Sequence, residues 1–309
     1  MPAGHLALFY RDSEEYLDAI SSFVAPALAA GEPVAIAVPG TRKLSLVREA
    51  LGDDAAEVEL LDMAELGRNP ARIISAIQGM IDQGGGCLHY VGEPIWPGRS
   101  AEEIREATRH EALINLAWPG REVRVLCPYD AAQLDDAILA HAELTHPDVM
   151  RDGRLAASPS YRGPAPPEVC EAPLPDPPAD SVALTFDAGE LKHIRALVAE
   201  QAAMAGLHPK RTAELVLAVN ELTTNSVKHA GIGGRLYLWS ESGEVICQVQ
   251  DTGRMIDPLA GRRRGRPGAG GFGLWMVNQL CDLVEVRTGG AGSTVRVHAR
   301  GSTAAPGAR

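Results

Sequence analysis

The chain has 309 residues, 45% of them hydrophobic and 22% charged, and a formal net charge of −11. This composition is typical of a globular protein, and the length is sufficient for two domains of ordinary size. The acidic balance argues against direct binding of nucleic acid, which needs a basic face to neutralise phosphates.

Nothing in the sequence predicts export or a membrane anchor. The first residues lack the basic segment and apolar core of a signal peptide. The longest apolar stretch, residues 23–38, is interrupted by Gly31, Glu32 and Pro33, so it cannot span a bilayer. Five scattered cysteines without a Cys-x-x-Cys pair fit buried thiols better than disulfides or a zinc site. We therefore expect a cytoplasmic protein without a membrane segment.

The first half of the chain alternates short apolar runs with helical patterns. Strands are predicted at residues 6–9, 34–38, 58–61, 87–91 and 123–126. Helices are predicted between them at residues 13–30, 41–51, 69–83 and 101–117. Strands that alternate with helices predict a mostly parallel sheet covered on both faces, here over residues 1–156.

A proline-rich segment, residues 157–180, separates the two halves. Proline at the density seen from Ser158 to Asp180 cannot continue a helix or a central strand. The segment therefore predicts a semi-rigid, extended linker and a domain boundary.

The second half, residues 181–300, has a different order of elements. Strands are predicted at residues 182–186, 234–240, 244–251, 284–288 and 293–299. Helices are predicted at residues 188–205, 209–229 and 272–280, with a long loop rich in glycine and arginine before the last. This order predicts an α/β sandwich in which the helices cover one face of a mixed sheet. Residues 301–309 are predicted to form a flexible tail.

The helix predicted at residues 209–229 carries Glu221 and Asn225, four residues apart and therefore on one helical face. A carboxylate, which can accept a proton, thus lies beside an amide oxygen that suits a hard cation such as Mg²⁺. Taken alone, the pair also fits a solvated polar flank beside the apolar stripe of the helix.

Two further motifs follow in order. Asp251-Thr-Gly253 ends a strand, as a simple turn does, or presents an acceptor for the exocyclic amine of a purine. Glycines at positions 268, 270, 271 and 273 precede an apolar helix, where they form a flexible cap or a cradle for phosphate oxygens. The glycines match neither a Walker A sequence nor a dinucleotide fingerprint.

The order of these motifs carries a specific resemblance. Residues 181–300 resemble the GHKL (Bergerat) ATPase fold of histidine kinases and gyrase, and within it most closely the anti-sigma-factor serine kinases. Residues 221–230 match the N box, residues 251–253 the first glycine box and residues 268–274 the second. The closing Gly292-Ser-Thr294 fits the same pattern.

The resemblance implies a site for ATP and Mg²⁺. Glu221 would be the general base that takes a proton from a serine of the protein substrate, and Asn225 would hold Mg²⁺. Asp251 would accept a hydrogen bond from the adenine amino group, and Thr294 would lie near the base. The full set implied to bind the nucleotide is Asn225, Lys228, His229, Asp251, Gly253, Gly268, Gly270, Gly271, Phe272, Gly273, Leu274 and Thr294. His229 is equally compatible with a structural role.

One feature departs from the relatives, and a second disfavours a histidine kinase. Residues 261–267 are unusually basic, which suits contact with phosphates, an acidic partner or simply solvent. A histidine kinase would carry a two-helix dimerisation segment with a phospho-accepting histidine before the ATPase domain, where this chain has the proline-rich segment. We interpret His193, in the first helix of the second half, as a surface residue.

The first half has no phosphate-binding loop of the Walker type after any predicted strand. Residues 4–150 resemble the MEDS sensory domain, a RecA-like module without catalytic motifs, through Gly4-His5, Phe9-Tyr10, residues 30–32, 92–94, 110–111 and 126–129. A group of polar residues could converge at one sheet edge: His5, Glu93, Glu111, Cys127 and His141. They could form a sensory pocket for a small molecule or a metal site, or have purely structural roles.

Together these features predict a cytoplasmic anti-sigma regulatory factor. It would bind Mg-ATP and a sigma factor, and it would phosphorylate a serine of a STAS-domain anti-anti-sigma factor. An unknown small-molecule ligand of the N-terminal domain would gate this activity, without direct contact to nucleic acid or membrane. The resemblance also admits a homodimer. The alternatives are a non-catalytic ATP-dependent regulator that binds partners, and a signalling protein that resembles histidine kinases.

Overall fold

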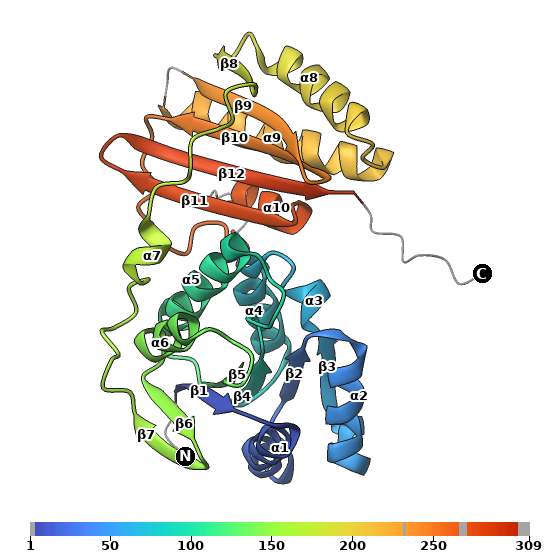
Figure 1. Ribbon diagram of the computed structural model, residues 1–309, viewed down its shortest axis with the longest axis vertical. Helices are drawn as coiled ribbons and strands as arrows, with labels where there is room; N and C mark the ends of the chain where they lie inside the picture. Colours follow the sequence, from blue (N-terminus) through green and yellow to red (C-terminus); the bar gives the residue numbers. More distant parts are fainter. Residues whose placement is uncertain (1–3, 231–232, 266–270, 302–309) are drawn as a thin grey trace, which may run out of the picture. The chain divides into compact units, whose positions relative to one another are not determined.

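The computed structural model describes residues 4–230, 233–265 and 271–301, and Figure 1 shows its elements. The chain divides into two compact units, residues 1–171 and 172–309. The dividing point falls within the proline-rich segment that we predicted as a linker. We describe each unit by itself.

The N-terminal unit is built on a seven-stranded sheet with the order β3-β2-β4-β5-β1-β6-β7. Every pairing is parallel except that of β6 with β7. The prediction of a mostly parallel sheet is therefore confirmed. The strands are β1 His5–Tyr10, β2 Val34–Val38, β3 Val58–Asp62, β4 Leu88–Gly92, β5 Val123–Asp130, β6 Asp148–Arg151 and β7 Arg154–Ala157.

Helices cover both faces of this sheet. On one face, α1 and α2 pack on apolar side chains that alternate along the strands, including Leu8, Ile36 and Leu126. On the other face, α5 and the end of α6 lie against the side chains of His5 and Tyr129. The helices are α1 Ser13–Ala29, α2 Gly40–Leu51, η1 Gly52–Glu57, α3 Met63–Leu66, η2 Pro70–Arg72, α4 Ile73–Gln83, α5 Ala101–Ala117, α6 Asp136–Thr145 and α7 Glu168–Glu171.

The C-terminal unit holds a five-stranded sheet with the order β11-β12-β10-β9-β8. The prediction of a mixed sheet is wrong, because every pairing in this sheet is antiparallel. Two of the connections are tight hairpins, and that between β9 and β10 uses positive φ angles at Ser242 and Gly243. The elements are β8 Val182–Phe186, α8 Leu191–Met204, α9 Pro209–Ala230, β9 Gly234–Glu241, β10 Glu244–Asp251, α10 Phe272–Leu280, β11 Leu283–Gly289 and β12 Gly292–Arg300.

All three helices of this unit cover one face of the sheet, as predicted. The stripe of Leu215, Val219 and Leu222 on α9 is buried in their shared core, so it fixes the rotation of that helix. Of the predicted tail, the structure describes only Gly301, and residues 302–309 lie outside the described parts.

The opposite face of the same sheet mixes polar side chains with apolar ones such as Ile246 and Trp239. His298 on β12 lies there, with Nδ1 3.0 Å from Glu244 Oε2 and Nε2 3.3 Å from Glu285 Oε2. Part of the proline-rich segment covers this face, because Arg296 Nη2 donates to the carbonyl oxygen of Pro175 at 2.5 Å. An earlier part forms α7 and buries Cys170 in the N-terminal unit. The segment is therefore anchored at these points, while most of its residues are exposed.

Candidate functional site

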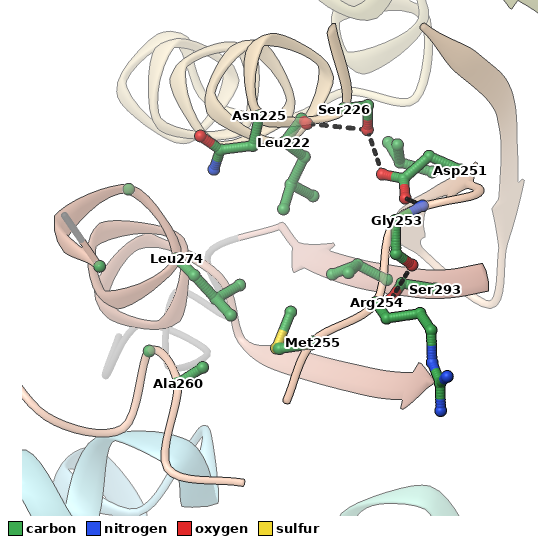
Figure 2. A pocket seen from close by; sticks show the side chains of 15 residues that line it. Leu222, Asn225, Ser226, Asp251, Gly253, Arg254, Met255, Ala260, Leu274 and Ser293 are labelled. Atoms are coloured by element: carbon green, nitrogen blue, oxygen red, sulfur yellow. Dashed lines mark hydrogen bonds between the residues drawn. The ribbon is translucent and has the colours of Figure 1, made fainter. Parts of the chain in front are cut away.

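A cavity of about 270 Å³ lies in the C-terminal unit between α9, the start of α10 and the ends of β10 and β12 (Figure 2). Segments far apart in the sequence form its walls. The lining residues are Leu222, Asn225, Ser226, Val249, Asp251, Gly253, Arg254, Met255, Ala260, Gly261, Gly271, Gly273, Leu274, Ser293 and Val295. Its apolar floor with a few polar groups is typical of a small-molecule site.

Asp251, the last residue of β10, is held in a fixed orientation at one wall of this cavity. The Ser226 hydroxyl donates to Oδ2 at 2.6 Å, and the backbone N–H of Gly253 donates to Oδ1 at 2.8 Å (Figure 2). Ser293 Oγ in turn donates to the carbonyl oxygen of Gly253 at 2.8 Å. A carboxylate has more lone pairs than these two bonds use, so Asp251 is positioned to accept a further hydrogen bond from a ligand.

Glu221 and Asn225 lie at the opposite side, where α10 begins. A Cβ atom on Gly273 would stand 2.9 Å from Glu221 Oε2 and 3.1 Å from Asn225 Nδ2. Because residue 273 is glycine, the first turn of α10 approaches both side chains in these positions, and a larger residue would make them shift. Asn225 lines the cavity, whereas Glu221 lies beside it and is partly exposed.

The start of α10 is suited to an anion. Gly271 precedes the helix with a φ of 80°, a left-handed conformation that favours glycine, and no side chain caps the helix. The N–H groups of the first turn have no partner within the helix, and the helix dipole adds partial positive charge there. A phosphate group is the ligand that this arrangement fits.

The loop before α10 is anchored against the same helix. Asn278, which is 2% exposed, donates from Nδ2 to the carbonyl oxygen of Gly261 at 3.0 Å. Gly261 has a φ of 73°, and a Cβ there would stand 2.5 Å from Leu274 Cγ. The basic run begins at this anchor, and the Arg264 guanidinium lies 5.4 Å from the centre of the Trp275 ring. Residues 266 and 267 lie outside the described parts.

The structure brings half of the twelve residues predicted to bind the nucleotide together. Those that line the cavity are Asn225, Asp251, Gly253, Gly271, Gly273 and Leu274. Lys228 is exposed on α9, and Phe272 is 47% exposed and packs on Trp275 with 5.1 Å between ring centroids. Gly268, Gly270 and the side chain of His229 lie outside the described parts. His193 is exposed on α8, as we expected.

Thr294 is not part of this cavity, so the expectation that it lies near the base needs correction. Strand side chains alternate between faces, and on β12 the core face holds Ser293 and Val295. Ser293 therefore occupies the position that we assigned to Thr294. Sequence reasoning also missed Ser226, although it directly follows Asn225 in the N box. A polar residue next to the apolar stripe was the signal for it.

In the N-terminal unit, three of the five predicted polar residues converge. His5, Glu111 and Cys127 are 4%, 0% and 1% exposed, and His5 Nε2 lies 2.9 Å from Glu111 Oε2. Their fourth neighbour is His146 rather than His141. Burial lowers the pKa of His5 to about 4. Burial acts to raise the pKa of Glu111, but the two histidines hold it below its ordinary value.

Glu93 lies apart from this cluster, at the carboxyl end of β4. It is fully buried, pairs with Lys43 and accepts hydrogen bonds from Tyr10 at 3.1 Å and Tyr16 at 3.2 Å. Burial raises its pKa against the effect of Lys43. A second cavity of about 310 Å³ opens beside these residues, lined by Tyr10, Arg11, Asp12, Ser13, Tyr16, Arg42, Lys43, Leu46, Asp130 and Gln133. Ligands of parallel α/β sheets commonly bind at this end of the strands.

Comparison with known proteins places a family match on each unit. Residues 4–147 match the sequence model of MEDS, the MEthanogen/methylotroph, DcmR Sensory domain. Residues 184–299 match that of the histidine kinase-like ATPase domain. These matches confirm the predicted pair of a MEDS domain and an ATPase domain of this type. No curated protein matches the chain.

A solved structure of the RsbU and RsbW domains of Rv1364c from Mycobacterium tuberculosis is similar in part. It is 23% identical over 40% of this chain and 33% of that chain, with a TM-score of 0.30. This chain thus covers a third of that protein's chain, and a similarity at this TM-score carries no functional argument. Among the described helices, none has both the length and the apolar character needed to cross a membrane.

Proposed function

We propose that this chain is an ATP-dependent protein kinase of the anti-sigma type. Its C-terminal unit would bind Mg-ATP and phosphorylate a serine of a STAS-domain anti-anti-sigma factor, and it would also bind a sigma factor in the cytoplasm. The observation that carries the proposal is the close approach of α10 to Glu221 and Asn225 at Gly273, where no Cβ holds these side chains away. In this proposal the approach would set a phosphate site, a cation ligand and a base beside one another.

The residues present fit both ATP and Mg²⁺. Asp251, fixed by Ser226 and Gly253, offers an acceptor to the amino group of adenine above an apolar floor. The start of α10 offers N–H groups to the phosphates. The Asn225 amide has no hydrogen bond to any residue in the described parts of the chain, so its oxygen is free to hold Mg²⁺.

Phosphoryl transfer needs positioning and charge neutralisation rather than covalent help from the protein. Bound Mg²⁺ would neutralise charge on the phosphates. In this proposal the start of α10 orients the phosphates, and Glu221, one helical turn before Asn225, accepts the proton of the serine hydroxyl at a carboxylate oxygen. Its place beside the cavity, rather than in its wall, suits a group that faces a protein substrate.

The N-terminal unit would sense a small polar molecule. The cavity next to Glu93 has cations from Arg11, Arg42 and Lys43, and it lies at the carboxyl ends of the strands. Lys43, in the wall of this cavity, forms an ion pair with the buried Glu93. A ligand that took the place of either residue in this pair would leave the other residue without its partner, at a cost in free energy.

The test uses the full chain with labelled ATP and a candidate STAS protein. Glu221→Gln should lower transfer at least about 100-fold, the range for a general base, and leave ATP affinity unchanged. Glu200→Gln, an exposed glutamate on α8, is the matched control and should transfer normally. Undiminished transfer in Glu221→Gln would refute its role. Wild-type protein that binds ATP and partners without any transfer would instead support the non-catalytic regulator.

A further inference from the structure

The cluster of His5, Glu111, Cys127 and His146 joins four elements of the N-terminal unit. His5 begins β1 and Cys127 lies on β5, and their side chains share the sheet face that is opposite to Leu8 and Leu126. Glu111 projects from α5, and His146 directly follows α6. All four side chains are buried. A buried set of this chemistry needs a reason, because each member has a polar atom removed from water.

The four ligand atoms point at one another. Cys127 Sγ lies 3.3 Å from His5 Nε2 and 3.2 Å from Glu111 Oε2. His146 Nε2 lies 3.4 Å from Glu111 Oε2. The four ligand atoms all fall within 4.8 Å of one another.

The surrounding hydrogen bonds determine where the histidine protons lie. His146 Nδ1 is 2.8 Å from the carbonyl oxygen of Ala142, which can only accept. His5 Nδ1 is 3.3 Å from Asn115 Oδ1, and the Asn115 amide nitrogen donates to backbone carbonyls, which identifies Oδ1 as the acceptor. Both rings therefore carry hydrogen on Nδ1, which leaves the two Nε2 atoms, both facing Glu111, as the ring positions open to a metal ion.

The centre brings together a buried carboxylate, a thiol and two ring nitrogens. The Cys127 thiol donates to Glu111 Oε2 at 3.2 Å. His146 Nε2, which is fully buried, has the 3.4 Å contact to Glu111 Oε2 and makes no hydrogen bond of ordinary geometry within the described parts of the chain. A cation at the centre, with Cys127 as a thiolate, would contact the carboxylate, the sulfur and both Nε2 atoms at once.

We propose that this cluster binds a divalent transition-metal ion of the zinc class through His5, Glu111, Cys127 and His146. Zinc bonds of about 2.0–2.3 Å place tetrahedral ligand atoms about 3.3–3.7 Å apart. Four of the six separations between these ligand atoms are 2.9 to 3.4 Å and all six lie within 4.8 Å, so the side chains start close to this arrangement. Imidazole, thiolate and carboxylate are the ligands that zinc prefers, and the histidine contacts to Asn115 and Ala142 are typical of the outer shell.

Four protein ligands leave no open position, so the site is structural or regulatory rather than catalytic. Through these ligands the ion would cross-link strands β1 and β5 with helix α5 and the end of helix α6. This inference does not depend on the kinase proposal, because the two concern different units and different chemistry.

The experiment measures metal in the full-length protein. Zinc content by mass spectrometry should be one equivalent, and replacement by Co²⁺ should add a thiolate charge-transfer band and the visible bands of tetrahedral cobalt. Cys127→Ser should lose the charge-transfer band and bind zinc more weakly. Cys247→Ser, which removes a fully buried thiol of the C-terminal unit, is the control and should match the wild type.

Asn115→Leu provides a milder variant in case Cys127→Ser fails to fold, as circular dichroism would show. It keeps all four ligands and removes the acceptor of the His5 proton, so zinc affinity should fall about 10–100-fold. Absence of bound metal in the wild type would overturn the proposal. The same stoichiometry and cobalt spectrum in Cys127→Ser would also overturn it, and would direct attention to the separate group of Glu32, Cys87 and His89.

Discussion

Replacing Gly273 with alanine tests the proposed ATP site at its tightest point. The added methyl group would lie 2.9 Å from Glu221 Oε2 and 3.1 Å from Asn225 Nδ2. Normal contact is about 3.5–4.0 Å, so each side chain must retreat by roughly 0.5–1 Å. A displacement of about 1 Å in a positioned group can lower a rate about 100-fold, which corresponds to about 2.7 kcal/mol of barrier.

The same substitution should leave the fold intact. Both clashing atoms are at the ends of flexible side chains, and alanine is favoured over glycine within a helix by about 0.5–1 kcal/mol. We therefore expect an unchanged or slightly higher melting temperature together with a large loss of phosphoryl transfer. A change in stability alone would not explain that combination.

The assay compares transfer rates and thermal unfolding of the full chain. Gly79→Ala is the matched control, because Gly79 lies inside α4 and a Cβ there meets nothing within 4 Å in the described parts. It should gain similar stability and keep the normal transfer rate. Wild-type transfer in Gly273→Ala would refute the positioning argument, and an unfolded variant would refute the claim that the side chains give way.

Three further predictions concern the C-terminal unit. Asp251→Asn should weaken ATP binding by about 1.5–3 kcal/mol, measured by calorimetry, because it replaces one charged acceptor with an amide. Ser226→Ala removes only the bond that orients Asp251, so the same titration should show a smaller loss. Glu244 and Glu285 raise the pKa of His298 above its ordinary 6.5 despite burial, which acts to lower it. Its contribution to stability is therefore complete below about pH 6.5 and is lost as the pH rises through the raised value. In His298→Gln, amide exchange of β12 should lose this alkaline dependence, and an unchanged pH profile would contradict the assignment.

The fold was predictable where apolar residues repeat with a clear period. Each strand and helix that we expected is present, because its core-facing side chains follow the period of the element. The short helices η1, α3 and α7 were not predicted, and neither were α6, β6 and β7. Only Ala142 and Thr145 of α6 are buried, so that helix has no apolar stripe. The β6 and β7 strands have four residues each, and only the Asp152-Gly153 turn marked them.

The residues of the ATP site that form contiguous motifs were predictable from the sequence. The residues that line the cavity from a strand were not, because the sequence did not show which of them face the cavity. A shift of one residue along β12 moves a side chain to the other face, which separates Thr294 from Ser293. Met255 and Ala260 also line the cavity, and they belong to a loop that is positioned by the hydrogen bond from Asn278 to the carbonyl oxygen of Gly261. No local pattern encodes the course of that loop.

In the N-terminal unit, the strand topology separates polar residues that we predicted to form one site. We expected His5 and Glu93 at one edge of the sheet. His5 begins β1, whereas Glu93 follows the last residue of β4, and both strands run parallel to β5. They therefore lie at opposite ends of the strands. At about 3.3 Å per residue, the five steps from His5 to Tyr10 span roughly 16 Å. One strand thus carries a ligand of the proposed metal centre at its start and a wall of the proposed sensory cavity at its end. The direct connection between the two is β1 itself, which pairs with β5 on one side and with β6 on the other.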